Sequence, residues 1–195
     1  MSRIEPRSLG AANGASVSLR TLESRHAVEA VQYLDAVRRT TVGLNLSPAD
    51  PLPTIEAERQ WIDAQIETPG NLHLAAWAEG RIVGMCGAHA PTGVRTRHAA
   101  TVGVSLLPEW RSRGLGRRMM RAIIDWAERE PQLLVLRLDV FTDNPVALKL
   151  YRSLGFEVAG RQRWAARRED GASVDAIQMH RWVGDEAPPV DENAP

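Results

Sequence analysis

The sequence predicts an α+β domain built on one central, mostly antiparallel sheet. Two turn signals, Glu79-Gly80 and Asp170-Gly171, each lie between two runs of strand-forming residues and indicate β-hairpins. Before and between these hairpins, apolar residues recur at the three- and four-residue spacing of amphipathic helices. Because hairpins join antiparallel neighbours, this order of segments favours a mixed α and β fold with an antiparallel majority.

The first part of the chain predicts one strand and two helices. Residues 17–20 are the first expected strand, and residues 24–38 carry apolar residues at helical spacing. Residues 41–53 hold three prolines and are expected to form a loop. A second helix is expected from Thr54, because Glu56 and Glu58 in its first turn favour the positive end of the helix dipole.

The rest of the chain predicts further strands and two more helices. One helix follows Gly114 and ends near Arg129. The other is marked by Asn144 as N-cap, by Pro145 at its first position and by Gly155 beyond its end. The expected strands span residues 72–78, 81–90, 99–107, 133–141, 156–165 and 173–182.

Length and charge limit the kinds of protein that this chain can be. The 195 residues allow one domain, expected at 16–183, between a flexible leader (1–15) and a disordered acidic tail (184–195). With 24 basic and 24 acidic side chains, the chain lacks the basic excess of nucleic-acid-binding proteins. No apolar run suits a membrane span, and the histidines have no metal-ligand spacing. A single cysteine and the lack of a signal-peptide pattern favour the cytoplasm.

The segment from Val102 to Arg117 carries the strongest functional signal. An apolar strand runs into Pro108, and a short loop with Gly114 and Gly116 then enters an amphipathic helix. Loop amides and the positive end of the helix dipole together favour a bound anion, and the glycines let it approach the backbone closely. Positive charge is added by Arg111, Arg113, Arg117 and Arg118. The pattern therefore predicts a diphosphate site.

The two glycines do not match the common nucleotide-binding loops. A P-loop ends in Gly-Lys-Ser/Thr, whereas two arginines follow Gly116. A dinucleotide-binding loop has a third Gly or Ala where this chain has Met119, and it usually lies early in the fold. The sequence therefore disfavours an ATP, GTP or dinucleotide ligand.

Two motifs, in the right order, resemble those of the GCN5-related N-acetyltransferases. Arg111-Ser-Arg-Gly114-Leu-Gly116 is similar to their motif A. The stretch from Leu138 to Phe156, with its Leu-Tyr-x-x-x-Gly-Phe ending, is similar to motif B. The resemblance covers roughly residues 17–183 and implies a GNAT fold: a twisted sheet of about seven strands, splayed at the fourth and fifth, flanked by about four helices. It also implies direct transfer of an acetyl group from acetyl-CoA to an amine in a ternary complex, with no metal.

The resemblance assigns the acetyl-CoA site to the strand and loop of motif A. In the family, the free edge of the splayed strand pairs with the pantetheine arm, which implies Val104, Ser105 and Leu106 here. Loop amides hold the pyrophosphate. The residues implied for this loop are Arg111, Ser112, Arg113, Gly114, Leu115, Gly116 and Arg117. Asn144 is expected to cap its helix, and the resemblance adds a contact with the pantetheine or the acceptor.

Tyr151 is the candidate catalytic acid, and Asp139 is the candidate base. A phenol with a pKa of about 10 can protonate a leaving thiolate with a pKa of about 8.5 at a cost of ~2 kcal/mol. Asp139 matches the carboxylate that accepts the proton in some family members. Glu109 is the rival base, although it can simply anchor an arginine or cap the turn. Proton removal through water stays open.

The acceptor expected first is an amino acid or a similar small amine, because the last hairpin and strand look similar to that branch of the family. A protein N-terminus, such as that of a ribosomal protein, is the alternative acceptor. A non-catalytic CoA-binding module on the same fold is the alternative from another class of function.

Succinyl-CoA is an open second acyl donor, with the arginines at 161–168 as its partners. A homodimer is open, whereas nucleic-acid and membrane partners are not expected.

Overall fold

The computed structural model describes residues 3–10, 15–40, 43–44 and 46–186. Its strands are β1 (Arg7–Gly10), β2 (Ser16–Thr21), β3 (Leu72–Ala78), β4 (Arg81–His89), β5 (Ala99–Leu106), β6 (Val135–Phe141), β7 (Glu157–Arg167) and β8 (Ser173–Trp182). Its α-helices are α1 (Ala27–Arg38), α2 (Ile55–Glu67), α3 (Leu115–Ala127) and α4 (Pro145–Ser153). None of these helices is both long and apolar enough to cross a membrane.

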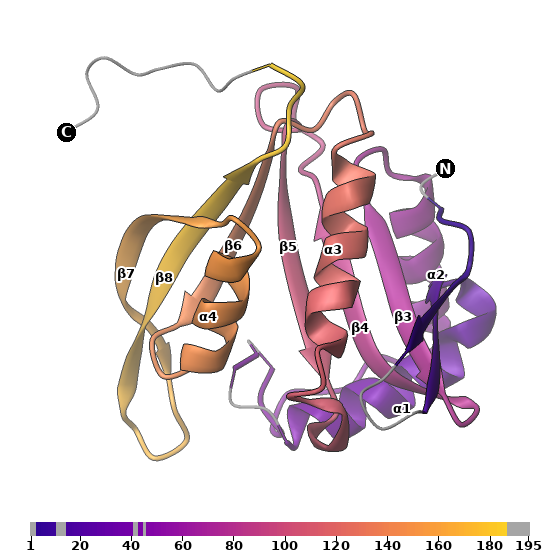
Figure 1. Cartoon of the computed structure of the whole chain (residues 1–195). Helices are drawn as coiled ribbons and strands as arrows, with labels where there is room; N and C mark the ends of the chain where they lie inside the picture. The colour runs from indigo at the N-terminus through magenta and orange to yellow at the C-terminus, as the bar shows by residue number, and fades with distance from the viewer. Residues whose placement is uncertain (1–2, 11–14, 41–42, 45, 187–195) are drawn as a thin grey trace, which may run out of the picture.

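The described strands form one sheet with the order β1-β2-β3-β4-β5-β6-β8-β7. Neighbouring strands are antiparallel except for β5 and β6, which are parallel. Helices α1 and α2 lie on one face of this sheet, and α3 and α4 lie on the other (Figure 1). The mixed, mostly antiparallel architecture expected from the sequence is therefore confirmed.

The sheet has eight strands, whereas about seven were expected. The additional strand is β1, which lies within the predicted leader and pairs antiparallel with β2, from Arg7↔Leu19 to Gly10↔Ser16. Only Leu9 among its residues is buried. This strand therefore does not need the alternation of apolar and polar residues that would mark it in the sequence. Residues 11–14 of the predicted leader, and the predicted tail from residue 187 onward, lie outside the described residues.

Local sequence signals explain where three helices begin. Thr54 Oγ1 accepts a hydrogen bond from the amide of Ala57 at 3.1 Å before α2. In the same way, Asn144 Oδ1 accepts one from the amide of Ala147 at 3.1 Å before α4. Helix α3 follows Gly114, whose φ of 73° lies in the left-handed region that glycine enters without a steric penalty.

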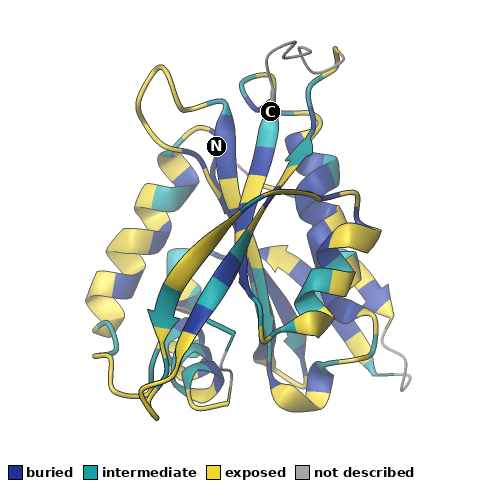
Figure 2. Ribbon diagram, turned by 90° about the vertical axis from the view of Figure 1, so that its left-hand side faces the viewer, coloured by how far each residue is buried: buried dark blue, intermediate teal, exposed yellow. Residues whose placement is uncertain are grey.

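The core fills the spaces between the sheet and its helices. Met119 and Ile123 of α3 are fully enclosed, and this helix packs against β4 and β5. Figure 2 shows buried residues concentrated where the helices and strands meet, with exposed residues on the outer sides of the helices. Cys86 of β4 belongs to this core, with its Sγ 3.8 Å from the carbonyl oxygen of Met119. Burial raises the pKa of the Cys86 thiol, so this residue acts in packing.

Strands β5 and β6 pair at one end only and then separate. Their parallel ladder runs from Ala99↔Val135 to Thr101↔Arg137, and the described residues form no further pair between them. In Figure 1 the two strands meet at the top and diverge downward, toward the ends at which α3 and α4 begin. The expected splay is confirmed, and the additional β1 makes its two strands the fifth and sixth of the chain.

Candidate active site

The motif A loop alternates between left-handed and ordinary backbone conformations. Ser112 has a φ of 58° and Gly114 a φ of 73°, whereas Arg113 between them does not have a positive φ. Such alternation turns successive N–H groups toward one side and forms a concavity suited to anions. A serine at positive φ is uncommon, and strain of this kind concentrates in functional loops. The guanidinium carbon of Arg113 lies 5.8 Å from the centre of the Trp110 ring, which supports the loop.

The backbone amides of this loop are available to a ligand. The Arg111 amide donates to the carbonyl of Pro108 at 3.1 Å, and the Arg118 amide donates to that of Gly114 at 3.2 Å. Within the described part of the chain, no backbone hydrogen bond is donated by the amides of residues 112–117. Several of these amides belong to the first turn of α3, at the positive end of its dipole. The loop can therefore hold an anion with several oxygens.

Two arginines of the loop hold its position in the fold. Arg111 Nε donates to the carbonyl of Leu106 at 3.0 Å, and its Nη1 donates to the carbonyl of Thr40 at 3.2 Å. Arg117 Nη2 donates to the carbonyl of Ser153 at 3.1 Å, at the negative end of the α4 dipole. The expected positive charge is therefore present, and these side chains also brace the loop against β5, α1 and α4.

Packing among the described residues does not require glycine at position 116, and the close approach of a ligand that the sequence suggests there stays a prediction. A Cβ at this position would meet Leu106 Cδ1 at 3.5 Å and Leu150 Cδ2 at 3.8 Å, which are ordinary van der Waals distances. Gly116 and its neighbour Leu115 are both buried. The missing side chain of Gly116 thus faces the packing of α3 on β5 and α4. Gly114, with its positive φ, is the position at which the backbone requires glycine.

Val104, Ser105 and Leu106 lie on the part of β5 that has separated from β6. On one side they pair with β4, and on the other no β6 residue pairs with them in the described structure. A free strand edge presents N–H and C=O groups to which an extended ligand can bind. The Ser105 hydroxyl also lies 2.8 Å from that of Tyr33 on α1, a residue that the sequence did not assign to the site.

Tyr151 reaches the same strand from α4. It is 6% exposed, and its ring packs edge-on against that of Phe156, with the centroids 5.7 Å apart. Burial raises the pKa of Tyr151 to about 12, while a polar contact with the backbone of Val104 opposes part of this rise. The phenol is therefore protonated at neutral pH and lies beside the free edge of β5. Both properties suit a proton donor.

Asn144 and Glu109 both have structural partners. The side chain of Asn144 caps α4, as expected, and its contact with a ligand stays a prediction. Glu109 forms an ion pair with Arg81, in which Oε1 and Nη2 lie 3.2 Å apart and both side chains are about half exposed. Glu109 thus anchors an arginine, which is the structural role that the sequence left open for it.

Asp139 lines an open groove of about 840 Å³. Strand register places Thr101, Arg137, His180 and Glu157 in one row across β5, β6, β8 and β7, and all four line this groove. Asp139 lies two residues beyond Arg137 on β6, so both side chains share one face of the sheet. The groove is therefore lined by both cationic and anionic groups.

Asp139 and Tyr151 approach the splay from opposite faces of the sheet. Thr101 of the groove shares a face with Ser105, which α1 contacts, because side chains alternate along a strand. Tyr151 belongs to α4, which packs with α3 on the other face (Figure 1). A candidate proton donor and a candidate proton acceptor thus flank the region in which β5 and β6 separate.

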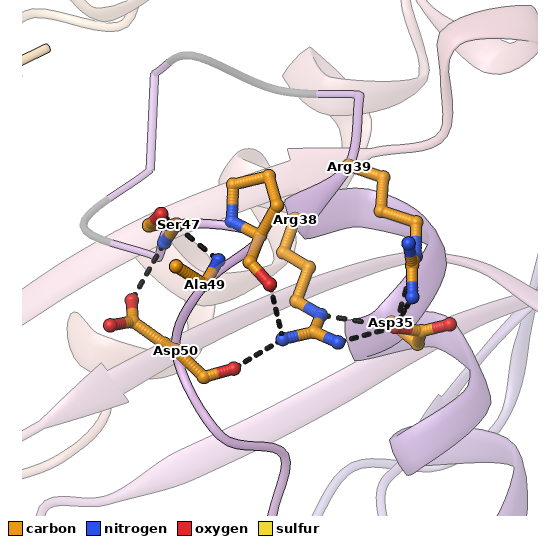
Figure 3. A network of polar contacts seen from close by, with 7 residues as sticks. Asp35, Arg38, Arg39, Ser47, Ala49 and Asp50 are labelled. Atoms are coloured by element: carbon orange, nitrogen blue, oxygen red, sulfur yellow. Dashed lines mark hydrogen bonds and ion pairs between the residues drawn. The ribbon is translucent and has the colours of Figure 1, made fainter. Parts of the chain in front are cut away.

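A polar network joins the end of α1 to residues 47–50 of the following loop (Figure 3). Arg38 donates to Asp35 Oδ1 at 2.8 and 3.0 Å, to the carbonyl of Pro48 at 3.0 Å, and to the carbonyl of Asp50. The carboxylate of Asp50 in turn accepts from the Ser47 amide at 2.7 Å. The sequence carried no signal for the two contacts of this network that join the helix to the irregular loop, because they depend on the path of the chain between them.

Two named bacterial acetyltransferases are similar in sequence to most of this chain. AaaT of Escherichia coli, an L-amino acid N-acetyltransferase, is 30% identical over 125 residues, which cover 64% of this chain and 76% of that protein. The N-alpha-acetyltransferase RimI of Mycobacterium tuberculosis is 36% identical over 138 residues, which cover 70% of this chain and 78% of that protein. Both similarities span most of the relative.

Solved structures share the fold. A GNAT-family acetyltransferase from Streptococcus pneumoniae aligns with a TM-score of 0.82 and 28% identity, covering 85% of this chain and 99% of that chain. A phosphinothricin acetyltransferase from Sinorhizobium meliloti, in complex with acetyl-CoA, aligns with a TM-score of 0.76 and 18% identity, covering 94% and 95% of the two chains. At this lower identity, the second likeness concerns the fold alone.

The sequence model of the Acetyltransferase (GNAT) family matches residues 39–156. This range holds the loop with available amides, the separated part of β5, and Tyr151. It covers more than half of the chain, and the fold and the named relatives agree with it. The chain therefore belongs to the GNAT family of acetyltransferases.

Proposed function

We propose that this chain transfers the acetyl group of acetyl-CoA to the α-amine of an amino acid or a similar small amine. The observation that carries the proposal is a single arrangement. Available amides at residues 112–117 and a free strand edge at 104–106 belong to one strand–loop–helix unit, and the protonated phenol of Tyr151 reaches that strand from α4. The family and the acetyl-CoA complex of the Sinorhizobium meliloti acetyltransferase support acetyl-CoA as the donor.

The chain's own groups fit acetyl-CoA along its length. Amides of residues 112–117 would bind the pyrophosphate, since two phosphate groups offer several acceptors to a row of donors. The free edge of β5 at Val104–Leu106 would pair with the amides of the pantetheine arm. This assignment brings the thioester to the separation of β5 and β6, where Tyr151 lies. Bound acetyl-CoA supplies an activated carbonyl and a thiolate leaving group.

Tyr151 would donate its proton to the departing sulfur while the amine nitrogen forms a bond to the acetyl carbon. The raised pKa of about 12 makes the phenol a weaker acid than a solvated one. A departing thiol buried in the same place would likewise have a raised pKa, as burial raises that of Cys86 in the core. The pKa difference between Tyr151 and such a thiol would therefore be smaller than the raised pKa of Tyr151 alone indicates.

Asp139 would take the proton that the acceptor amine must lose. The α-amine of a peptide, with a pKa near 8, costs only ~1–1.5 kcal/mol to deprotonate at pH 7, whereas an alkyl amine near 10.4 costs ~4–5 kcal/mol. Asp139 is exposed to solvent in the groove. The low deprotonation cost therefore favours α-amines over alkyl amines, and the α-amine of a free amino acid lies between a peptide α-amine and an alkyl amine because its carboxylate stabilises the ammonium. The name of AaaT of Escherichia coli, an L-amino acid N-acetyltransferase, supports the amino-acid acceptor.

A peptide or protein N-terminus is the second candidate acceptor. Its α-amine is easier to deprotonate than that of a free amino acid, and the groove of about 840 Å³ has the size of a site for a drug-sized ligand. RimI of Mycobacterium tuberculosis is named as an N-alpha-acetyltransferase. The cytoplasm, where both amino acids and new protein N-termini occur, is the compartment that we propose.

A thiol-release assay with acetyl-CoA tests the proposal. The acceptors are free L-amino acids, short peptides with free N-termini, a polyamine and an aminoglycoside, each at the same concentration. We expect turnover with the α-amines and little with the alkyl amines. Turnover with peptides alone would select the second candidate. CoA binding without turnover on any amine would identify a non-catalytic module and contradict the proposal.

A further inference from the structure

Tyr33 of α1 makes a polar contact with the separated strand from the groove side. Its hydroxyl lies 2.8 Å from that of Ser105, and 72 positions of sequence separate the two residues. Tyr33 is 3% exposed, and its hydroxyl also has a polar contact with the backbone of Met85 on β4. Burial raises the pKa of Tyr33, so the phenol stays neutral and keeps its hydrogen across the physiological pH range.

The same strand is contacted from its other face by Tyr151. Tyr151 approaches the backbone of Val104, and Tyr33 approaches the side chain of the next residue, Ser105. These two positions lie beyond the last pair between β5 and β6, so the strand lacks one neighbour there. A strand edge without a ladder partner moves more easily than a paired one. Polar contacts from both faces restrict this movement.

Helix α1 is joined to the motif A loop by a second contact. Arg111 bridges the carbonyl of Leu106, at the end of β5, and the carbonyl of Thr40, which follows α1, at 3.0 and 3.2 Å. The Tyr33 and Arg111 contacts thus join α1 to both parts of the proposed acetyl-CoA site. Arg38 of the same helix holds the loop at residues 47–50 (Figure 3).

We infer that Tyr33 is a positioning residue, which holds the free edge of β5 in the geometry that binds the pantetheine arm. This inference rests on the proposed function, because it assigns a role in acetyl-CoA binding. Loss of the Tyr33 hydroxyl leaves that of Ser105 without its partner and the strand restrained from one face only. Removal of this hydroxyl is therefore expected to weaken the binding of acetyl-CoA, because Tyr33 acts through Ser105 and touches no reacting atom.

Three variants of the full chain test the inference: Tyr33→Phe, Ser105→Ala and the double variant. Each single change is expected to raise the Kd of CoA and the KM of acetyl-CoA about fivefold, the effect of losing one neutral hydrogen bond of about 1 kcal/mol. kcat is expected to stay within about twofold of wild type. The double variant is expected to bind no more weakly than either single variant, because both remove the same contact.

Thr21→Val supplies the matched control. Thr21 Oγ1 accepts a hydrogen bond from the amide of Ile4 at 3.0 Å, on the β1 and β2 side of the sheet. Its loss is expected to lower Tm and leave the Kd of CoA unchanged. Tyr33→Phe with a lowered Tm and the wild-type Kd would show a merely structural role and overturn the inference.

Two further results would also contradict the inference. Additive effects of the Tyr33 and Ser105 changes would mean that the two hydroxyls act separately. A fall in kcat at unchanged KM would place Tyr33 in the chemical step instead. Wild-type protein that neither binds CoA nor turns over would refute the proposed function itself, and that result is distinct from a variant that binds CoA as wild type does.

Discussion

At the scale of single residues, Tyr151 supplies the sharpest prediction about chemistry. The Tyr151→Phe variant keeps the ring and its packing on Phe156 and removes the proton. We expect kcat to fall about 10²-fold, the usual contribution of a general acid, while the Kd of CoA stays within about twofold of wild type. Steady-state kinetics and calorimetry measure the two quantities. A variant with full kcat would show that the thiolate leaves without this acid.

The pKa of Tyr151 leads to a second residue-scale prediction. A general acid works while it is protonated, and burial raises the pKa of this phenol to about 12. Its proton is therefore retained up to about pH 10, where a solvated phenol would be half ionised. We expect kcat at saturating substrates to show no fall caused by this group between about pH 7 and 10. A falling limb with its midpoint below pH 10 that disappears in Tyr151→Phe would contradict this.

At the scale of elements, the two glycines of motif A are expected to differ. Gly114 has a φ of 73°, so Gly114→Ala forces alanine into the left-handed region at a cost of ~1–2 kcal/mol. It also shifts the amides at the start of α3. A Cβ at Gly116 meets only ordinary contacts. Gly116→Ala is therefore expected to keep wild-type stability and CoA affinity, whereas Gly114→Ala loses both.

Thermal unfolding and CoA titration of the two alanine variants check this difference. Equal losses in both variants would mean that the packing around Gly116 is tighter than its distances of 3.5 and 3.8 Å indicate. Wild-type behaviour of Gly114→Ala would mean that the loop adopts the same amide geometry without a left-handed residue. Either result would contradict the account of this loop as a backbone-built site.

At the scale of the whole molecule, acid sensitivity is expected to depend on His73. Its ring lies 4.2 Å from that of His89 and is buried, and this burial, with His89 nearby, lowers its pKa from 6.5 to about 3. Below about pH 6.5 the unfolded chain takes up a proton that the folded chain does not. The free energy of unfolding is therefore lost as pH falls toward 3, by at most ~1.4 kcal/mol per pH unit from this group.

The His73→Gln variant tests this dependence. Between about pH 6.5 and 4.5, we expect its free energy of unfolding to fall by ~2 kcal/mol less than that of wild type. Urea unfolding at a series of pH values measures the difference. His180→Gln, at an exposed histidine of the groove, is the matched control. Equal acid sensitivity in His73→Gln and wild type would mean that His73 is protonated alike in the folded and unfolded chain.

The sequence predicted the parts of the molecule that depend on local signals. Asn144, Pro145 and Gly155 bound α4 as their backbone preferences require, and the position of Tyr151 follows from the same stretch. Strand β1 was missed because its stability comes from pairing with β2, and its own residues carry no alternation. Side-chain contacts between distant segments, such as that of Tyr33 with Ser105, leave no trace in residue spacing.

The candidate site, like the fold, was predictable from the sequence only where local motifs mark it. Motif A located the loop, but the contacts of its arginines and the surroundings of Gly116 depend on neighbours brought in by the fold. The groove around Asp139 could not be foreseen, because its lining residues come from β5, β6, β7 and β8 and meet through strand register. Motifs thus locate the part of the site that we propose for acetyl-CoA, whereas the part that we propose for the acceptor depends on topology.

Calorimetric titration with CoA, dephospho-CoA and pantetheine is the most direct measurement of the central claim, that amides of residues 112–117 seat a pyrophosphate. Dephospho-CoA retains the pyrophosphate, and pantetheine lacks it. We expect CoA and dephospho-CoA to bind within about tenfold of each other, and pantetheine at least about 10²-fold more weakly, because it loses several charge-assisted hydrogen bonds. No binding of CoA by folded protein, or equal affinity for pantetheine and CoA, would contradict the account.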